Sequence, residues 1–229
     1  MKVIVFGATG MVGQGVLREC VRDPEVTEIL VVGRTPTGRT HPKLREAVHH
    51  DFTDFGPLAA RFEGFDACFF CLGVSAAGMK EADYRRVTYD YTLAAARPIA
   101  ERNPELTFVY VSGTGTDSTE RSRAMWARVK GATENALLAL PFHAYAVRPG
   151  YIQPLHGVRS KTAWYRAFYA VLAPFYPLLR RVAPGQVTTT EELGRAMLTL
   201  ARQGSPDRVL GSREINAAAA VNATSAQGS

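Results

Sequence analysis

Short apolar runs recur along the first part of the chain at intervals of roughly 20 to 30 residues. They are rich in β-branched and aromatic residues and lack regular polar alternation, which is typical of strands covered on both faces. They predict strands at Lys2–Phe6, Ile29–Val32, Ala47–His50, Ala67–Leu72, Thr107–Val111 and Ala144–Val147. Stretches between them predict helices at Met11–Val21, Lys80–Arg102 and Ser122–Leu140.

This alternation predicts the α/β class, because neighbouring parallel strands need a long crossover that is usually a helix. We therefore expect a doubly wound parallel sheet with helices on both faces. The chain has 229 residues, of which 46% are apolar and 21% charged. These values are ordinary for a globular domain and exclude a wholly disordered chain.

The pattern loosens after Gly150. The segment Trp164–Val182 is aromatic and carries arginines, and Pro174 and Pro177 prevent one regular amphipathic helix across it. It fits a lid or a packed segment better than a helix on a membrane surface, and contact with a partner is a further alternative.

Regular patterning returns near the C-terminus. Thr190–Gln203 begins with Thr-Glu-Glu and predicts an N-capped amphipathic helix, and Arg208–Leu210 predicts a last short strand. We expect residues 1–150 to form the core and residues 151–216 to form a small substrate or lid region of the same domain. Residues 217–229 hold little to bury and predict a flexible tail.

Charge and cysteine content exclude several classes of protein. The 27 Lys and Arg residues exceed the 21 Asp and Glu residues, but they are scattered and form no run of five. We expect a solvated basic surface and no nucleic-acid partner. Three cysteines cannot form a disulfide scaffold, which favours a reducing, cytoplasmic location. The sequence also has neither a targeting segment nor a run of about 18 uncharged apolar residues, so we expect no membrane partner.

The sharpest chemical signal is GATGMVGQG, which follows the first predicted strand and opens the first predicted helix. Gly7 permits a tight turn, Gly10 lets the backbone approach a pyrophosphate, and Gly13 lets the helix pack closely on the strand. Free N–H groups of the helix then face the phosphates. This spacing predicts a dinucleotide-binding Rossmann fold, with Thr9, Met11 and Val12 also in the binding loop. The alternative is a glycine-rich turn without a ligand.

The end of the second predicted strand indicates which dinucleotide binds. Many NAD sites carry an acidic residue there, but this chain has Gly33 followed by Arg34. A guanidinium pairs with a 2′-phosphate, whereas a carboxylate repels it. The sequence therefore favours NADP(H) over NAD(H). The alternative is that Arg34 is a surface residue and that both cofactors bind.

Two later loops add candidate contacts. Asp51 follows the third predicted strand and is a candidate to accept the adenine amino group, with Phe52 beside the ring, although an aspartate that caps a turn explains it nearly as well. Cys71 and Leu72 end the fourth predicted strand, Gly73 follows it, and all three are candidates to line the cofactor site.

No metal site is expected from the histidines and cysteines. His49 and His50 alternate across a strand and are interpreted as structural. Cys68 and Cys71 are three residues apart on a strand and should point to opposite faces, which argues against a redox or zinc pair.

Together these motifs resemble the short-chain dehydrogenase/reductase superfamily, in its atypical or extended form, among NAD-dependent epimerase/dehydratase-like proteins. The resemblance covers residues 1–150. It rests on GATGMVG, CLGVSAAG, VSGTG, the lysine that ends MWARVK, and RPG, which contains Pro149 as a further candidate cofactor contact.

The resemblance implies a catalytic Tyr-x-x-x-Lys pair with an upstream serine. Ser112 matches the serine, and Lys130 matches the lysine that holds the nicotinamide ribose and lowers the tyrosine pKa. Trp126 stands where the tyrosine is expected, and an indole N–H donates a hydrogen bond but does not titrate. Trp126 is therefore a candidate to bind a carbonyl or stack on nicotinamide, not to transfer a proton.

Three interpretations follow from this departure. The protein is an oxidoreductase or epimerase-like enzyme for a small carbonyl, alcohol or sugar-like substrate whose acid is another group, with Tyr84, Tyr89, Tyr151 and His156 as weak candidates. Alternatively, it is a non-catalytic NADP(H) sensor, or Lys130 is an ordinary helix lysine. The resemblance also allows a homodimer through the helices Lys80–Arg102 and Ser122–Leu140, and the sequence alone equally allows a monomer.

Overall fold

The computed structural model describes residues 1–158 and 176–225. Most of the segment Trp164–Val182, for which a lid was one interpretation, lies outside the described residues. Within the described residues, no helix is both long and apolar enough to cross a bilayer.

The centre of the molecule is a seven-stranded sheet in the order β3-β2-β1-β4-β5-β6-β9, with every neighbouring pair parallel. The strands are β1 (Lys2–Phe6), β2 (Glu28–Gly33), β3 (Leu44–Val48), β4 (Ala67–Phe70), β5 (Thr107–Val111), β6 (His143–Arg148) and β9 (Val209–Gly211). The predicted doubly wound parallel sheet is confirmed. Strand order reverses between β1 and β4, where ligands bind in folds of this kind.

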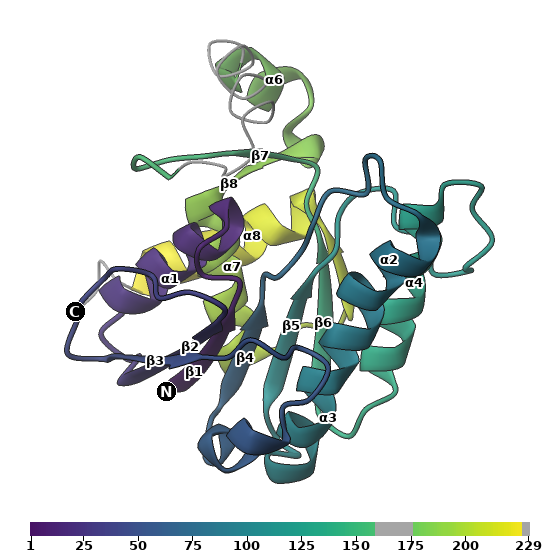
Figure 1. Cartoon of the computed structure of the whole chain (residues 1–229). Coiled ribbons are helices and arrows are strands. Elements are labelled where there is room, and N and C mark those ends of the chain that lie inside the picture. The colour runs from purple at the N-terminus through teal and green to yellow at the C-terminus, as the bar shows by residue number, and fades with distance from the viewer. Residues whose placement is uncertain (159–175, 226–229) are drawn as a thin grey trace.

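Helices cover both faces of the sheet, because alternate strand residues supply two separate cores (Figure 1). Val3 and Val5 of β1 face one core, and Ile4 and Phe6 face the other. The first core is covered by α1 (Met11–Arg22), α7 (Thr190–Gln203) and α8 (Ser212–Ser225). On the other side lie η1 (Gly56–Phe62), α2 (Glu81–Arg85), η2 (Arg86–Asp90), α3 (Tyr91–Arg102) and α4 (Met125–Leu138).

Two glycines bring α1 and α7 into close contact. A Cβ on Gly15 of α1 would lie 2.6 Å from the Cβ of Thr190, and a Cβ on Gly194 of α7 would lie 2.8 Å from the Cγ of Glu19. Any larger residue at either position would push the helices apart. As predicted, α7 is capped at its start: the Thr189 hydroxyl accepts a hydrogen bond of 2.9 Å from the Glu192 amide.

The chain after β6 builds a small layer beyond the carboxyl ends of the main strands (Figure 1). There β7 (Tyr151–Gln153) pairs in parallel with β8 (Val187–Thr189). The intervening described elements are α6 (Tyr176–Val182) and η4 (Pro184–Gln186). This layer overhangs the edge of the sheet at which a ligand would sit.

Two of the differences from the sequence-based prediction have a clear physical reason. The third strand begins at Leu44 instead of Ala47, because the charged residues Arg45 and Glu46 stand between the apolar positions of this edge strand and hide its apolar pattern. The helix α8 continues through residue 225, into the predicted flexible tail. Its Ala219 is buried against the first core, which accounts for the order of this segment.

Candidate functional site

The glycine loop joins β1 to α1, and two of its glycines are required by packing. Gly7 has a φ of +74°, and a Cβ there would lie 2.6 Å from the Cys71 carbonyl carbon. A Cβ on Gly13 would lie 2.1 Å from the Gly7 carbonyl oxygen. Gly10 differs, because a Cβ there would approach only the Gly7 oxygen, at 3.3 Å. Its absent side chain leaves space outside the protein's own packing.

The loop presents the start of α1 to this space. Gly10 is the N-cap of α1, no side chain caps the helix, and its first turn contains no acidic residue. The first amide groups of a helix have no partner within the helix and carry its positive dipole end. This terminus is therefore suited to an anion such as a phosphate.

A cavity of about 580 Å³ opens at this point, and a second of about 220 Å³ adjoins it. Most of the candidate cofactor residues line the larger cavity: Gly7, Thr9, Gly10, Met11, Val12, Arg34, Cys71, Leu72, Gly73, Lys130 and Pro149. Phe52 lines the smaller one, together with Gly33 and Arg34. Gly13 lines neither and acts through the packing described above.

Arg34 borders both cavities and follows Gly33, the last residue of β2. Its side chain is exposed and therefore accessible to a ligand. The nearby Lys43 is committed elsewhere, because its ammonium group donates to the carbonyls of Val21 and Asp23 at 3.3 and 2.7 Å. Arg34 is thus the cation that this loop offers to the cavity.

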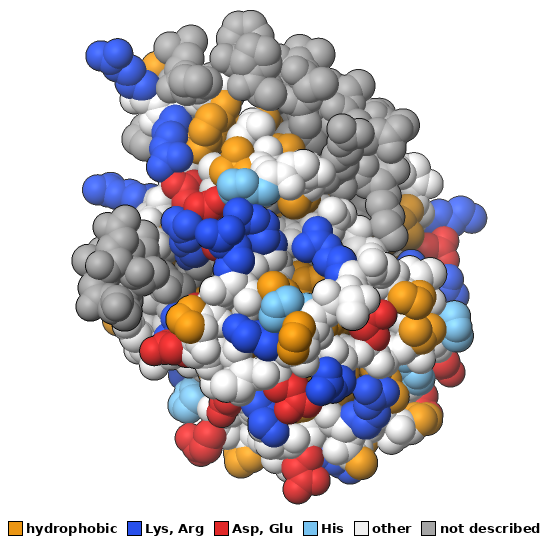
Figure 2. Space-filling view, turned by 90° about the vertical axis from the view of Figure 1, so that its left-hand side faces the viewer, with side chains coloured by type: hydrophobic (Ala, Val, Ile, Leu, Met, Phe, Trp, Pro, Cys, Tyr) orange, Lys and Arg blue, Asp and Glu red, His pale blue; other side chains and the backbone are white. Residues whose placement is uncertain are grey.

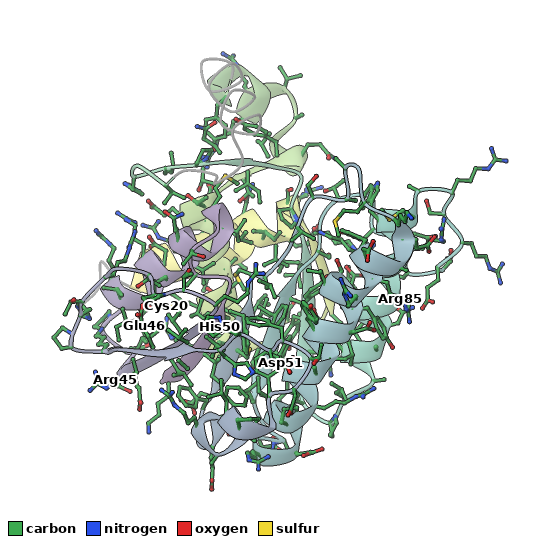
Figure 3. The ribbon with its side chains drawn as sticks, in the orientation of Figure 1. Cys20, Arg45, Glu46, His50, Asp51 and Arg85 are labelled. Carbon is green, nitrogen blue, oxygen red and sulfur yellow. The ribbon has the colours of Figure 1, made fainter. Side chains whose placement is uncertain are left out.

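Asp51 lies in the loop after β3, beside His50 (Figure 3). Its carboxylate accepts hydrogen bonds from the Thr53 amide at 2.9 Å and from the Thr53 hydroxyl at 2.5 Å. These bonds lower the pKa of the Asp51 carboxyl from its ordinary value. The side chain is exposed, is absent from the lining of both cavities and closes its own turn.

Lys130 and Ser112 meet at the other end of the larger cavity. Lys130, on α4, donates a hydrogen bond from Nζ to the Ser112 carbonyl. Ser112 follows β5, and both its amide and its hydroxyl donate to the Val147 carbonyl, at 2.9 and 3.2 Å. Burial lowers the pKa of the Lys130 ammonium to about 8, although Glu134 one turn further along opposes the shift. Both residues line the cavity.

Trp126 does not share this position. Its ring packs on Gly115, so that a Cβ on that glycine would lie 3.0 Å from the indole Cη2. Gly115 has a φ of +88°, which suits glycine. Trp126 is half-buried and is absent from the lining of the described cavity.

The other candidate acids are also engaged elsewhere. Tyr84 is buried in the core, and the Arg85 guanidinium stacks on the Tyr89 ring at 4.1 Å. The Tyr151 hydroxyl donates to Gln153 Oε1 at 2.8 Å, and His156 pairs with Glu191. None of these four candidates lines the described cavity.

The prediction that Cys68 and Cys71 point to opposite faces of the sheet is confirmed, because Cys68 packs into one core whereas Cys71 packs against the other. Burial raises the pKa of both thiols well above its ordinary value. The described residues contain no cluster of three or more His, Cys, Asp or Glu side chains placed to hold a metal. On the face shown in Figure 2, Lys and Arg side chains are spread among Asp and Glu.

Several lining residues were missed from the sequence. They lie where β5 ends, in the loops after β4, β5 and β6, or in β7: Val74, Ser75, Val111, Gly113, Gly150 and Ile152. Their shared signal is position, because the carboxyl ends of parallel strands converge on one edge of the sheet. Residue type alone does not mark them.

The parallel sheet, the glycine loop at the point where strand order reverses, and the cavity beside it define a Rossmann-type dinucleotide-binding fold. Solved structures agree with this fold. MoeE5 in complex with UDP-glucuronic acid and NAD has a TM-score of 0.66 and 18% identity, over 92% of this chain and 75% of that one. WbmG from Bordetella bronchiseptica in complex with NAD has a TM-score of 0.65 and 13% identity, over 99% and 78%.

Sequence relatives define the family. FMP52, mitochondrial, of Saccharomyces cerevisiae is 30% identical over 167 residues, which are 71% of this chain and 69% of the relative. The chain therefore belongs to the atypical short-chain dehydrogenase/reductase family that includes FMP52, as the motif resemblance implied. Rattus norvegicus HTATIP2 is 28% identical over 154 residues, 66% of this chain, and the match spans 62% of the length of HTATIP2. No established family model matches the chain.

Proposed function

We propose that this protein is an NADP(H)-dependent oxidoreductase that acts on a small carbonyl or alcohol substrate. The observation that carries the proposal is that one cavity is bordered by Arg34 after β2, by the glycine loop after β1 and by Lys130 from α4. In the sheet order β2-β1-β4-β5, these groups lie in the sequence that an extended dinucleotide would meet.

The residues present fit such a cofactor. A Cβ on Gly73 would meet nothing within 4 Å, although Gly73 lines the cavity. Gly10 is nearly as open, so both glycines leave room that the protein itself does not use. The cavity volume of about 580 Å³ also falls within the range of roughly 300–1,000 Å³ that is usual for ligand sites.

Each part of the cofactor has a candidate partner. The smaller cavity, with Phe52 and Val32, suits the adenine, and the start of α1 suits the pyrophosphate. Arg34 suits the 2′-phosphate, and Lys130 suits the nicotinamide ribose. When bound, the nicotinamide would supply or accept the hydride. The NAD named with MoeE5 and WbmG supports a nicotinamide dinucleotide, and Arg34 supports the phosphorylated form.

The wall around Lys130 indicates the substrate. Val111, Gly113, Pro149 and Ile152 are small or apolar, which suits a small carbonyl compound better than a large polar one. A non-catalytic sensor of NADP(H) is the second candidate function. It is favoured by the position of Trp126, which packs on Gly115 outside the described cavity.

Calorimetric titration with NADPH and with NADH tests the cofactor assignment. We expect Arg34→Ala to weaken NADPH binding by about tenfold or more, because a charge-assisted contact to phosphate is lost. The affinity for NADH should not change. Arg39→Ala is the matched control, because Arg39 is exposed in the same loop but lines neither cavity. Failure of the wild type to bind either nucleotide would contradict the proposal.

The setting of the protein is part of the same proposal. All three cysteines are free, which supports a reducing compartment such as the cytoplasm. FMP52 is named as mitochondrial, so cell fractionation is the direct test. The proposal includes neither a nucleic-acid partner nor a membrane partner. Analytical sedimentation would decide whether the protein is a monomer or a homodimer.

A further inference from the structure

The cavity contains few groups that can exchange a proton. Among the described residues that line it, the ionisable side chains are Arg34, Cys71 and Lys130. A guanidinium group does not act as a proton donor in proteins. Burial holds the pKa of the Cys71 thiol well above its usual range, so that thiol stays protonated. Among the described lining residues, Lys130 is therefore the side chain that can supply a proton, and water is the alternative source.

Lys130 is placed to donate into the cavity. Its Nζ gives one hydrogen bond to the Ser112 carbonyl, and an ammonium group has three N–H donors, so two have no partner among the described residues. The Nζ atom also lies 3.8 Å from the position that a Cβ on Gly113 would take. Because Gly113 has no side chain, the space beside the ammonium is open to a ligand.

Among the described residues, no carboxylate accepts a hydrogen bond from the remaining donors. Glu134, one turn further along α4, is buried and is held instead by Arg148, whose Nε donates to Glu134 Oε1 at 3.0 Å. Lys130 forms no ion pair with the residues that the structure describes. The ammonium therefore lies near the Glu134 carboxylate without forming an ion pair with it. Its pKa of about 8 lets it lose and regain a proton near neutral pH.

We propose that Lys130 itself delivers the proton to the substrate oxygen when a carbonyl is reduced, which is the step that a tyrosine performs in the family that the sequence resembles. The inference rests on the proposed function, with NADPH as the reductant. The carbonyl carbon receives the hydride, the π electron pair moves to the oxygen, and that oxygen takes the proton from Nζ. The products are the alcohol, NADP⁺ and a neutral amine, which regains its proton from water.

The first test measures the pKa of Lys130 without any catalytic turnover. The chain has only five lysines, so ¹³C-dimethylation of the whole protein gives few NMR signals, and Lys130→Arg assigns the one of interest. We expect that signal to titrate near pH 8, well below the usual lysine pKa of about 10.4. A Lys130 signal that titrates above about pH 10, with and without NADP⁺, would overturn the proposal.

The second test follows NADPH oxidation with 4-nitrobenzaldehyde as the carbonyl probe. We expect a rate that is constant below pH 8 and falls about tenfold per pH unit above it, because the ammonium is lost. Lys130→Met should lower the rate about 100-fold or more and remove this break in the pH profile. The control Lys80→Arg should keep both the rate and the break. Trp126→Phe should also keep the break, because the indole lies away from the cavity.

The possible outcomes distinguish a failure of the proposed function from a failure of the role of Lys130. Loss of NADPH binding in the wild type would refute the proposed function itself. NADPH binding together with a wild-type rate that has no break near pH 8 would refute only the role of Lys130 and assign the proton to water. NADPH binding without any reduction of the probe would also count against Lys130 as a donor and favour the sensor.

Discussion

The two ends of the cavity are built in different ways. At the end formed by β1, α1 and the loop after β4, the shape is set by backbone, and Gly7 and Gly13 are fixed by contacts below 3 Å. At the end formed by α4 and the loops after β5 and β6, the shape is set in part by side chains such as those of Lys130 and Ile152. A site that is shaped by backbone depends on consecutive residues and appears as a sequence motif. A site that is shaped by side chains depends on where distant segments of the chain meet.

The largest expected effect tests whether the glycine end is reserved for a ligand. Gly73→Val should leave the fold intact, because nothing lies within 4 Å of the added Cβ, yet it should block the cavity and abolish detectable NADPH binding. Calorimetry and thermal melting measure the two effects. Ala77→Val, an exposed position in the same loop that does not line the cavity, should bind as the wild type does. Unchanged binding in Gly73→Val would remove the basis for placing a cofactor there.

The second prediction concerns the ion pair between Glu134 and Arg148, in which Glu134 lies one helical turn after Lys130. Glu134→Gln should lower the free energy of unfolding by about 2–3 kcal/mol, because the Arg148 guanidinium loses the carboxylate that compensates its charge. Urea denaturation measures this. Glu105→Gln is the comparison, since Glu105 is 91% exposed in its contact with His143 and should change stability by less than about 0.5 kcal/mol. Equal effects would mean that the buried pair is not structural support for this end.

A smaller effect should appear in the pH dependence of stability. The pKa of Lys130 is lowered to about 8 in the fold, so between pH 8 and about 10.4 the unfolded chain binds more protons than the folded one. Wild-type stability should therefore rise with pH across this window relative to Lys130→Met. We expect about 1–2 kcal/mol, less than the full shift implies, because Lys130 is only partly buried by surface area. Parallel curves for the two proteins would show that the lysine is not perturbed.

The smallest expected effect concerns Asp51. Asp51→Asn should change NADPH affinity by less than about threefold, because its carboxylate is occupied by Thr53 and lines neither cavity. The same calorimetric titration that measures Arg34→Ala gives this value. A large loss would mean that the Asp51 loop rearranges to meet the adenine.

Much of the fold could be predicted from the sequence, for physical reasons. The apolar runs of β1, β4 and β5 are buried on both faces, and α7 carries both a cap and an amphipathic pattern. The short strands β7 and β8 were not predicted, because each spans three residues in the part of the chain after Gly150 where the apolar pattern loosens. The edge strand β3 was misplaced because its charged residues conceal it.

The candidate site divides in the same way. The glycines and Arg34 are local to one strand end each, so their positions followed from the motif. The contact of Trp126 with Gly115 and the bond from Lys130 to Ser112 join separate segments, and no local pattern reports them. The sequence could therefore suggest which residues matter at this end but not which of them face the cavity.

The close contact between α1 and α7 has a consequence for how this family changes over time. Because Gly15 and Gly194 each meet an atom of the opposite helix at less than 3 Å, neither can grow without a shift of the other helix. Substitutions at the two positions should therefore be correlated among homologues, with larger residues present at both positions or at neither. Since α1 begins at the glycine loop, this coupling would link sequence change at the phosphate-binding end to a helix that begins 179 residues further along the chain.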